Sequence, residues 1–177
     1  SMRNLKQLTL GLCAAVALSA GAAVQANEAP ADQEQVSPRN FVEEASAKGI
    51  AEIETGKLAL EKGTTADVKE FAQSMVEDHT AANKELSALA TKKQLEVSTE
   101  AELSNQAKAL ILKLRGEASF DKAYMNNQVM AHKETIELFQ KASNAEDAEI
   151  AAFAKQTLPK LEHHLKMAEQ INSQLPE

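Results

Sequence analysis

Four segments of the chain, each about 25 residues long, place apolar residues at every third or fourth position, and this spacing most constrains the fold. In the segment that starts at Thr64, for example, Val68, Phe71 and Met75 fall on one stripe. Such a spacing gives a helix one apolar face, and no stretch alternates with the two-residue period of a strand. The chain is therefore predicted to be all-α, with essentially no sheet.

The ends of the predicted helices are marked by residues that cap or stop a helical turn. Ser37 can accept a hydrogen bond from a first-turn amide, and Pro38 loses nothing at the first helical position. Thr64 and Asn144 are each followed by an aspartate three residues later, as at a capped helix start. Five helices are expected, over residues 38–62, 64–93, 99–116, 117–142 and 144–175.

The four long helices are joined in pairs by tight turns near residues 63–64 and 144–145, which favours a ferritin-like four-helix bundle built from two antiparallel hairpins. The short helix over 99–116 would connect the hairpins. Pro159 cannot donate to the carbonyl of residue 155, so the last helix should kink or restart there. A single bundle domain is predicted over 37–175, after a lead-in over 27–36 that lacks apolar periodicity and is expected to be disordered.

The first 26 residues have the three parts of a cleavable export signal. Arg3 and Lys6 give a positive start, an uncharged apolar run follows, and Ala26 ends a small-x-small pattern. Cleavage after Ala26 and a periplasmic location are expected. The alternative is an uncleaved membrane anchor, but the run is short and diluted with Gly, Ser and Thr, so no stable membrane insertion is expected after cleavage.

Loss of this leader would change the composition of the mature chain. It would leave 17 basic and 26 acidic residues, a formal charge of −9, so a nucleic-acid partner is not expected. The only cysteine, Cys13, would also be lost, which excludes a disulfide, a thiolate ligand and a thiol nucleophile. With no Trp, one Tyr and five Phe, the core must be aliphatic and closely packed.

Residues that can bind a metal fall on the apolar faces of these helices. His79, His132 and His164 each share a face with apolar residues, whereas His163 is turned away by about 100°. Glu52 shares a stripe with small and apolar residues, where a carboxylate is costly unless something pairs with it. These four inward residues are expected to meet inside the bundle.

The heights of the inward residues along the bundle can be compared from the two hairpin turns. If both turns lie at the same end, a rise of about 1.5 Å per residue puts Glu52, His79 and His132 within about 6 Å of one level. His164 would lie about 6 Å further along, nearer Asp121. These heights are compatible with one elongated site or with two adjacent sites. If the turns lie at opposite ends, the heights cannot be compared in this way.

Five short motifs accompany these residues: Phe71–His79, Phe120–Tyr124, Val129–His132, Leu158–Pro159 and His164–Leu165. In this combination, and together with residues 51–56, they resemble a bacterial family of exported proteins with a ferritin-like bundle, the domain-of-unknown-function family 4142. The resemblance covers about residues 40–171. It implies the fold, an exported location and metal binding by recurrent histidine and acidic positions, but no settled activity.

Imidazole and carboxylate groups that converge in a bundle core are how such folds build metal sites. A transition-metal site is therefore predicted, with copper, zinc and iron all open. Its expected ligands are Glu52, His79, Asp121, His132 and His164, with Asp121 as a ligand or an outer acid. Met75 and Met167, each one turn from a histidine, would suit copper or would simply fill the core.

Other chemistries find little support. No Glu-x-x-His pair occurs, which disfavours a ferritin-type di-iron centre, and the chain has no Gly-rich phosphate loop. Asp78 cannot face His79, because adjacent helical residues diverge by about 100°, so it either orients a neighbouring ligand or is solvated. Two alternatives remain beside metal binding. One is a non-enzymatic structural or stress-related interaction module, and the other, less favoured, is a metal-dependent redox enzyme.

Overall fold

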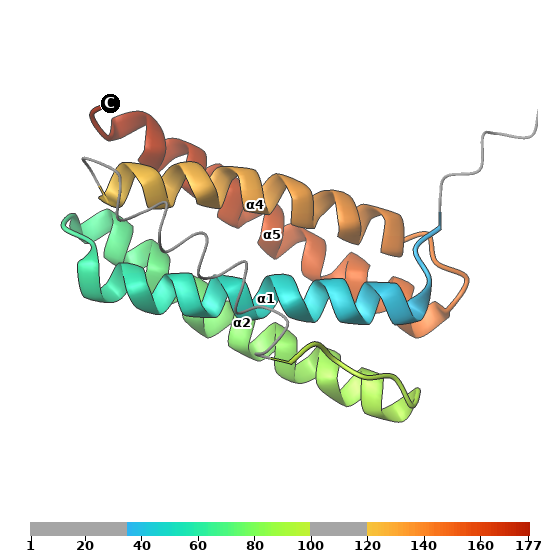
Figure 1. The fold of residues 1–177 in the computed structure, drawn as a ribbon. Coiled ribbons are helices and arrows are strands. Elements are labelled where there is room, and N and C mark those ends of the chain that lie inside the picture. Colours follow the sequence, from blue (N-terminus) through green and yellow to red (C-terminus); the bar gives the residue numbers. More distant parts are fainter. Residues whose placement is uncertain (1–34, 100–119) are drawn as a thin grey trace, which may run out of the picture. The chain divides into compact units, whose positions relative to one another are not determined.

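Four long α-helices make up most of the residues that the computed structural model describes, 35–99 and 120–177. They are α1 (Pro38–Lys62), α2 (Ala66–Lys92), α4 (Phe120–Ala142) and α5 (Ala148–Gln174) (Figure 1). The described residues contain no strand, so the all-α prediction is confirmed. The predicted leader, most of the lead-in and nearly all of the predicted helix over 99–116 lie outside the described residues.

The first helix has the bounds that its flanking residues predict. Ser37 accepts the backbone N–H of Asn40 at 3.1 Å, Pro38 occupies the first turn, and the backbone leaves the helix at Gly63. The second helix begins slightly later than expected. Thr65 rather than Thr64 is its cap, because Thr64 is engaged by an acid of α4.

The last helix also starts later than expected, and it does not restart at its proline. Asp147 is the cap, with its Oδ1 3.1 Å from two helical N–H groups, whereas Asn144 bonds back to the end of α4. The helix runs unbroken through Pro159. Leu158 and Leu161 on either side pack into the core, and this burial holds the helix together across the missing hydrogen bond.

The two hairpin turns lie at opposite ends of the bundle. Asp121 at the start of α4 bonds to Thr64 in the α1–α2 turn. At the other end, Lys93 after α2 pairs with Asp147 before α5, with 2.7 Å between Nζ and Oδ2. The end of α2 and the start of α4 therefore lie at opposite ends of the bundle. The heights of the inward residues were compared on the assumption that both turns lie at the same end, so that comparison does not hold.

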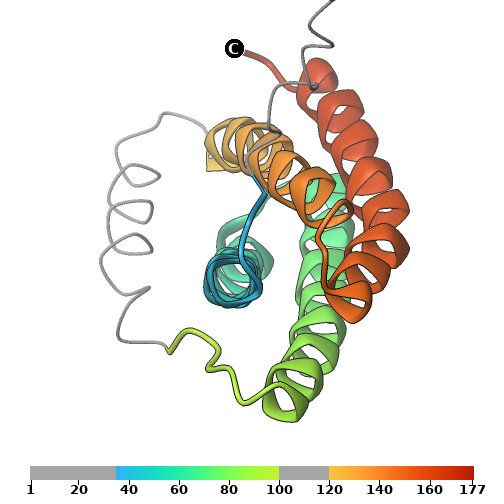
Figure 2. The ribbon, with the colours of Figure 1, turned by 90° about the vertical axis from the view of Figure 1, so that its right-hand side faces the viewer.

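Each helix packs against two antiparallel neighbours, α1 and α5 both lying against α2 and α4 (Figure 2). Two glycines bring α1 close to α2. A Cβ at Gly49 would overlap the side-chain amide of Asn83, and one at Gly56 would lie 2.9 Å from Cγ2 of Val76. The Asn83 amide uses this space to donate to the carbonyl of Ser46 at 3.1 Å, which fixes the register of the pair.

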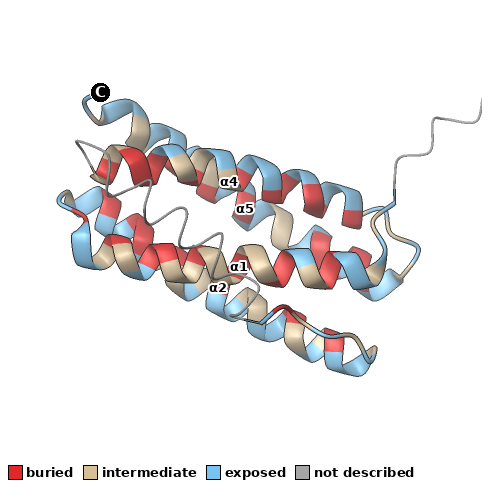
Figure 3. Cartoon of the chain, in the orientation of Figure 1, coloured by how far each residue is buried: buried red, intermediate tan, exposed pale blue. Residues whose placement is uncertain are grey.

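Buried residues face the middle of the bundle (Figure 3) and form two apolar clusters. One surrounds Phe41 and Phe139 near the α4–α5 turn, with their ring centroids 5.1 Å apart. The other surrounds Phe71 and Tyr124 near the α1–α2 turn. Along every helix, the stretch between the two clusters carries buried polar residues: Glu52, His79, Gln128, His132 and His164. None of the described helices is long and apolar enough to cross a membrane.

Candidate metal centre

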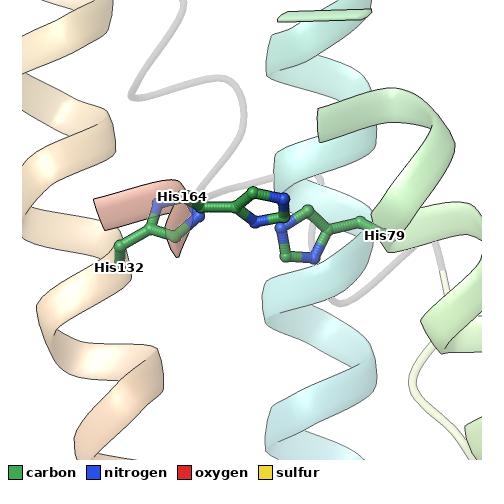
Figure 4. A group of neighbouring side chains, drawn as sticks. All are labelled: His79, His132 and His164. Atoms are coloured by element: carbon green, nitrogen blue, oxygen red, sulfur yellow. The ribbon is translucent and has the colours of Figure 1, made fainter. Parts of the chain in front are cut away.

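Three buried histidines from three helices converge in the polar middle of the bundle (Figure 4). His79 comes from α2, His132 from α4 and His164 from α5, and they are 7%, 1% and 2% exposed. One ring nitrogen of each lies within 4.8 Å of those of the other two. We call these residues the histidine triad. His164 is thus level with the other two, and the expected offset of about 6 Å fails because the turns lie at opposite ends.

In two of the three rings, those of His132 and His164, a hydrogen bond fixes which nitrogen carries the proton. Nδ1 of His132 lies 2.8 Å from the carbonyl oxygen of Gln128, which can only accept, so Nδ1 donates and Nε2 keeps its lone pair. Nε2 of His164 lies 2.7 Å from Oδ2 of Asp78, so Nε2 donates and Nδ1 keeps the lone pair.

One nitrogen on each ring of the triad has no hydrogen-bond partner. Nε2 of His79, Nε2 of His132 and Nδ1 of His164 are all buried and unpaired. Buried polar atoms are nearly always hydrogen-bonded, and leaving one unpaired costs about 1–3 kcal/mol. Three such atoms on three neighbouring rings mark a place built for a ligand that accepts lone pairs.

The environment keeps all three rings neutral at pH 7. Burial, together with the His132 and His164 rings, lowers the pKa of His79 to about 3, although Asp78 acts in the opposite direction. Burial lowers the pKa of His132 to about 4, although its bond to Gln128 acts in the opposite direction. Burial also lowers the pKa of His164, although its bond to Asp78 opposes this. Neutral imidazole is the form that binds metals.

A narrow cavity lies beside the triad. It encloses about 20 Å³ of space for a water-sized particle, which is room for one water or ion. Both His79 and His164 line it, together with Asp78, Lys160 and several apolar side chains. The apolar lining consists of Leu86, Phe139, Phe153 and Leu161 among others. A wider surface groove between α2 and α5 is lined by no histidine, so we do not assign the site there.

Glu52 lies in the same layer but is not a member of the triad group. The side chains of Gln128 and Tyr124 interact with it, and its Oε2 has no hydrogen-bond partner. Burial raises its pKa to about 7, although the Gln128 side chain and Lys48 act to lower it. This acid therefore keeps its proton to a higher pH than an exposed glutamate does, and it is not a member of the triad group.

The structure places Asp121 away from the triad, at the α1–α2 turn. Its Oδ2 accepts the hydroxyl of Thr64 at 2.8 Å and the N–H of Thr65 at 2.9 Å, and its Oδ1 accepts the N–H of Thr64 at 3.0 Å. Burial alone would raise the pKa of Asp121, but these bonds outweigh it and lower the pKa. The carboxylate is used to hold the turn against α4.

The structure also shows the surroundings of the two methionines and of Asp78. Met75 and Met167 belong to, or pack against, the apolar cluster near the α1–α2 turn, as core residues do. Asp78 bonds to His164 across the α2–α5 interface, the first of the two roles left open for it. Helical spacing could not reveal this contact because it depends on how the two hairpins dock.

Comparison with known proteins gives the fold and the family. No curated protein matches this chain. Three solved structures share its fold: CopM in the Cu(I)-bound form (TM-score 0.63, 15% identity, 77% of this chain and 95% of that chain), in the Ag-bound form obtained by soaking (0.66, 15%, 81% and 99%), and in the Cu(II)-bound form (0.64, 14%, 78% and 97%). The model of the family described as a domain of unknown function, DUF4142, matches residues 22–171. This chain therefore belongs to the DUF4142 family, as its motifs indicated.

Proposed function

We propose that this protein binds a transition-metal ion through His79, His132 and His164, and that the ion is cuprous copper. The observation that carries the proposal is the set of three unpaired nitrogens on three buried, neutral and adjacent rings. Imidazole is a good ligand for copper, zinc and iron. A bound ion would supply each of these nitrogens with the partner that the protein does not.

The charge of the surroundings favours a singly charged ion. Three neutral imidazoles bring no negative charge, and the carboxylate in contact with them, Asp78, is shared with Lys160 at 3.6 Å. Burying an ion in a poorly compensated site costs far more for a double charge than for a single one. Zinc is the competing metal, because three histidines with an open fourth position also suit it.

The likeness in fold supports the same choice. The solved structures that share this bundle belong to a protein bound to Cu(I), Cu(II) or silver. The leader-like first 26 residues support an exported protein, so we propose that the metal is bound in the periplasm. The less favoured redox enzyme would need a carboxylate-rich dinuclear centre, whereas the metal-competent group found among the described residues contains histidines alone.

Metal titration of the purified mature protein tests the proposal. We expect one cuprous ion per chain, measured by competition with a chromophoric cuprous chelator, and loss of this binding in His79→Ala and His132→Ala. His163→Ala is the matched control, because His163 is exposed and lies beside His164 on α5. Unchanged uptake in both triad variants would refute the site. No uptake by the wild-type protein would favour the structural module, whose inward histidines merely hydrogen-bond.

A further inference from the structure

Asp78 joins the triad to the protein surface. Its Oδ2 lies 2.7 Å from Nε2 of His164, and its Oδ1 lies 3.6 Å from Nζ of Lys160. The side chain of Asp78 is 30% exposed, whereas that of His164 is 3% exposed. Asp78 and Lys160 also line the small cavity beside the triad. One carboxylate therefore touches a buried triad ring, a surface cation and the space next to the site.

The contact with His164 decides which nitrogen of that ring is available. A free neutral imidazole can carry its proton on either nitrogen. A carboxylate accepts but does not donate, so Asp78 holds the proton on Nε2 and leaves the buried, unpaired Nδ1 with its lone pair. Without this contact, part of the population would carry the proton on Nδ1, where a ligand could not bind.

The same carboxylate supplies negative charge. Glu52, the other acid in the polar layer, is not part of the triad group and makes neither of the hydrogen bonds to the rings of His132 and His164. Asp78 is therefore the acid placed to compensate an ion at the triad, and Lys160 offsets part of its charge. Outer carboxylates that hold a ligating histidine typically change metal affinity by about 10–100-fold when they are removed.

We propose that Asp78 is the positioning residue of this centre: it holds His164 with Nδ1 free to bind, and its charge, tempered by Lys160, sets how strongly the triad prefers a singly over a doubly charged ion. The part that concerns affinity rests on the proposed function. The part that concerns the ring of His164 does not, because it describes the protein without metal.

The first experiment reads the tautomer of His164 in the metal-free protein by ¹⁵N NMR of its ring. Wild type and Asp78→Asn, whose amide oxygen can still accept, are expected to show the Nε2–H form. Asp78→Ala is expected to show a mixture. Glu77→Gln is the matched control, since Glu77 is an exposed acid of the same helix that bonds only to Gln73. A pure Nε2–H form in Asp78→Ala would overturn the positioning role.

The second experiment compares Ag⁺ and Zn²⁺, two redox-inert ions of different charge, by competitive titration. Asp78→Ala should weaken both by about 10–100-fold. Asp78→Asn removes charge but keeps the acceptor, so its loss of Zn²⁺ affinity should be about twice its loss of Ag⁺ affinity on a logarithmic scale. Lys160→Gln should strengthen Zn²⁺ binding more than Ag⁺ binding, and Glu77→Gln should change neither.

The outcomes separate the two proposals. If wild type binds neither ion, the proposed function fails while the NMR result still decides the role of Asp78. If wild type binds metal and Asp78→Asn lowers the two affinities equally, or lowers neither, the charge role is refuted. If Asp78→Ala retains both the tautomer and the affinities, the whole inference is wrong and His164 is held by packing alone.

Discussion

The histidine triad and Asp121 are both buried and polar, and both were expected from the sequence to bind metal, yet they use their polar atoms differently. Each ring of the triad keeps one nitrogen without a partner. Both oxygens of Asp121 accept hydrogen bonds from Thr64 or Thr65. The difference teaches that burial alone does not mark a binding residue. A better mark of a candidate ligand is a buried polar atom that has no hydrogen-bond partner within the protein.

Glu52 lies between these two cases. It is 5% exposed, and one of its oxygens has no partner, as in the triad. It is an acid beside other polar side chains of the protein, as at Asp121, but its pKa is raised rather than lowered. Because Glu52 is buried without strong hydrogen-bond donors, its ionised form destabilises the metal-free protein.

The largest expected effect is the loss of metal binding when a triad ring is replaced by an apolar side chain. His132→Leu should lower the affinity for Cu⁺ by more than about 100-fold, because one of three ligands is removed. The stability of the metal-free protein should change by no more than about 1 kcal/mol, since an unpaired buried nitrogen is lost along with one hydrogen bond. Urea unfolding without metal and chelator competition measure the two. A large loss of stability with metal binding retained would mean that His132, like Asp121, has a structural role.

Asp121→Ala should show the opposite pattern. It removes a charged acceptor and leaves the donors of Thr64 and Thr65 unpaired, so the free energy of unfolding should fall by about 2–3 kcal/mol. The midpoint of thermal unfolding should fall by roughly 2–4 °C for each kcal/mol. Metal stoichiometry should be unchanged, because the turn is distant from the triad group. Metal binding that disappears while the helical circular dichroism persists would return Asp121 to the list of ligands.

Glu52→Gln should stabilise the metal-free protein at high pH. The pKa of Glu52 is about 7 in the folded state against an ordinary 4.5, so the folded state binds more protons between these values. Its contribution to stability is complete below about pH 4.5 and is lost as the pH rises through 7. The variant should therefore exceed wild type by up to about 3 kcal/mol at pH 8 and match it at about pH 4. Urea unfolding at the two pH values measures this, and a pH-independent difference would contradict it.

Met75→Leu should have the smallest effect. Met75 lies in the apolar cluster near the α1–α2 turn, and Leu has a similar volume, so stability should change by less than about 1.5 kcal/mol. The affinity for Cu⁺ should change by less than about two-fold, since the thioether fills the core rather than ligating. The titration used for the triad variants checks this. A ten-fold loss would show that a soft sulfur ligand reaches the ion after all.

Much of the fold could be predicted because it depends on residues close together in the sequence. The Ser37–Pro38 start and the Gly63 stop place α1 correctly, and the inward faces of His79, His132 and His164 follow from helical spacing. These are properties of single helices, for which periodicity and capping residues are sufficient.

What could not be predicted depends on how the hairpins pack. The way the second hairpin docks on the first decides whether the turns share an end, and no local pattern encodes that choice. The level of His164, the role of Asp121 and the contact between Asp78 and His164 all follow from it. Thr64 was expected to cap α2, but its hydroxyl is bound by an acid 57 residues away.

The division of the bundle into two hairpins also determines when the triad can form as the chain folds. His79 belongs to the hairpin of α1 and α2, and His132 and His164 to that of α4 and α5. Each hairpin joins helices that follow one another directly, so each can form early from local contacts, whereas docking the two must bring together residues far apart in the sequence. The complete triad exists only in the docked state. An ion bound there would link the two hairpins. Its binding free energy would stabilise the docked state relative to the separated hairpins.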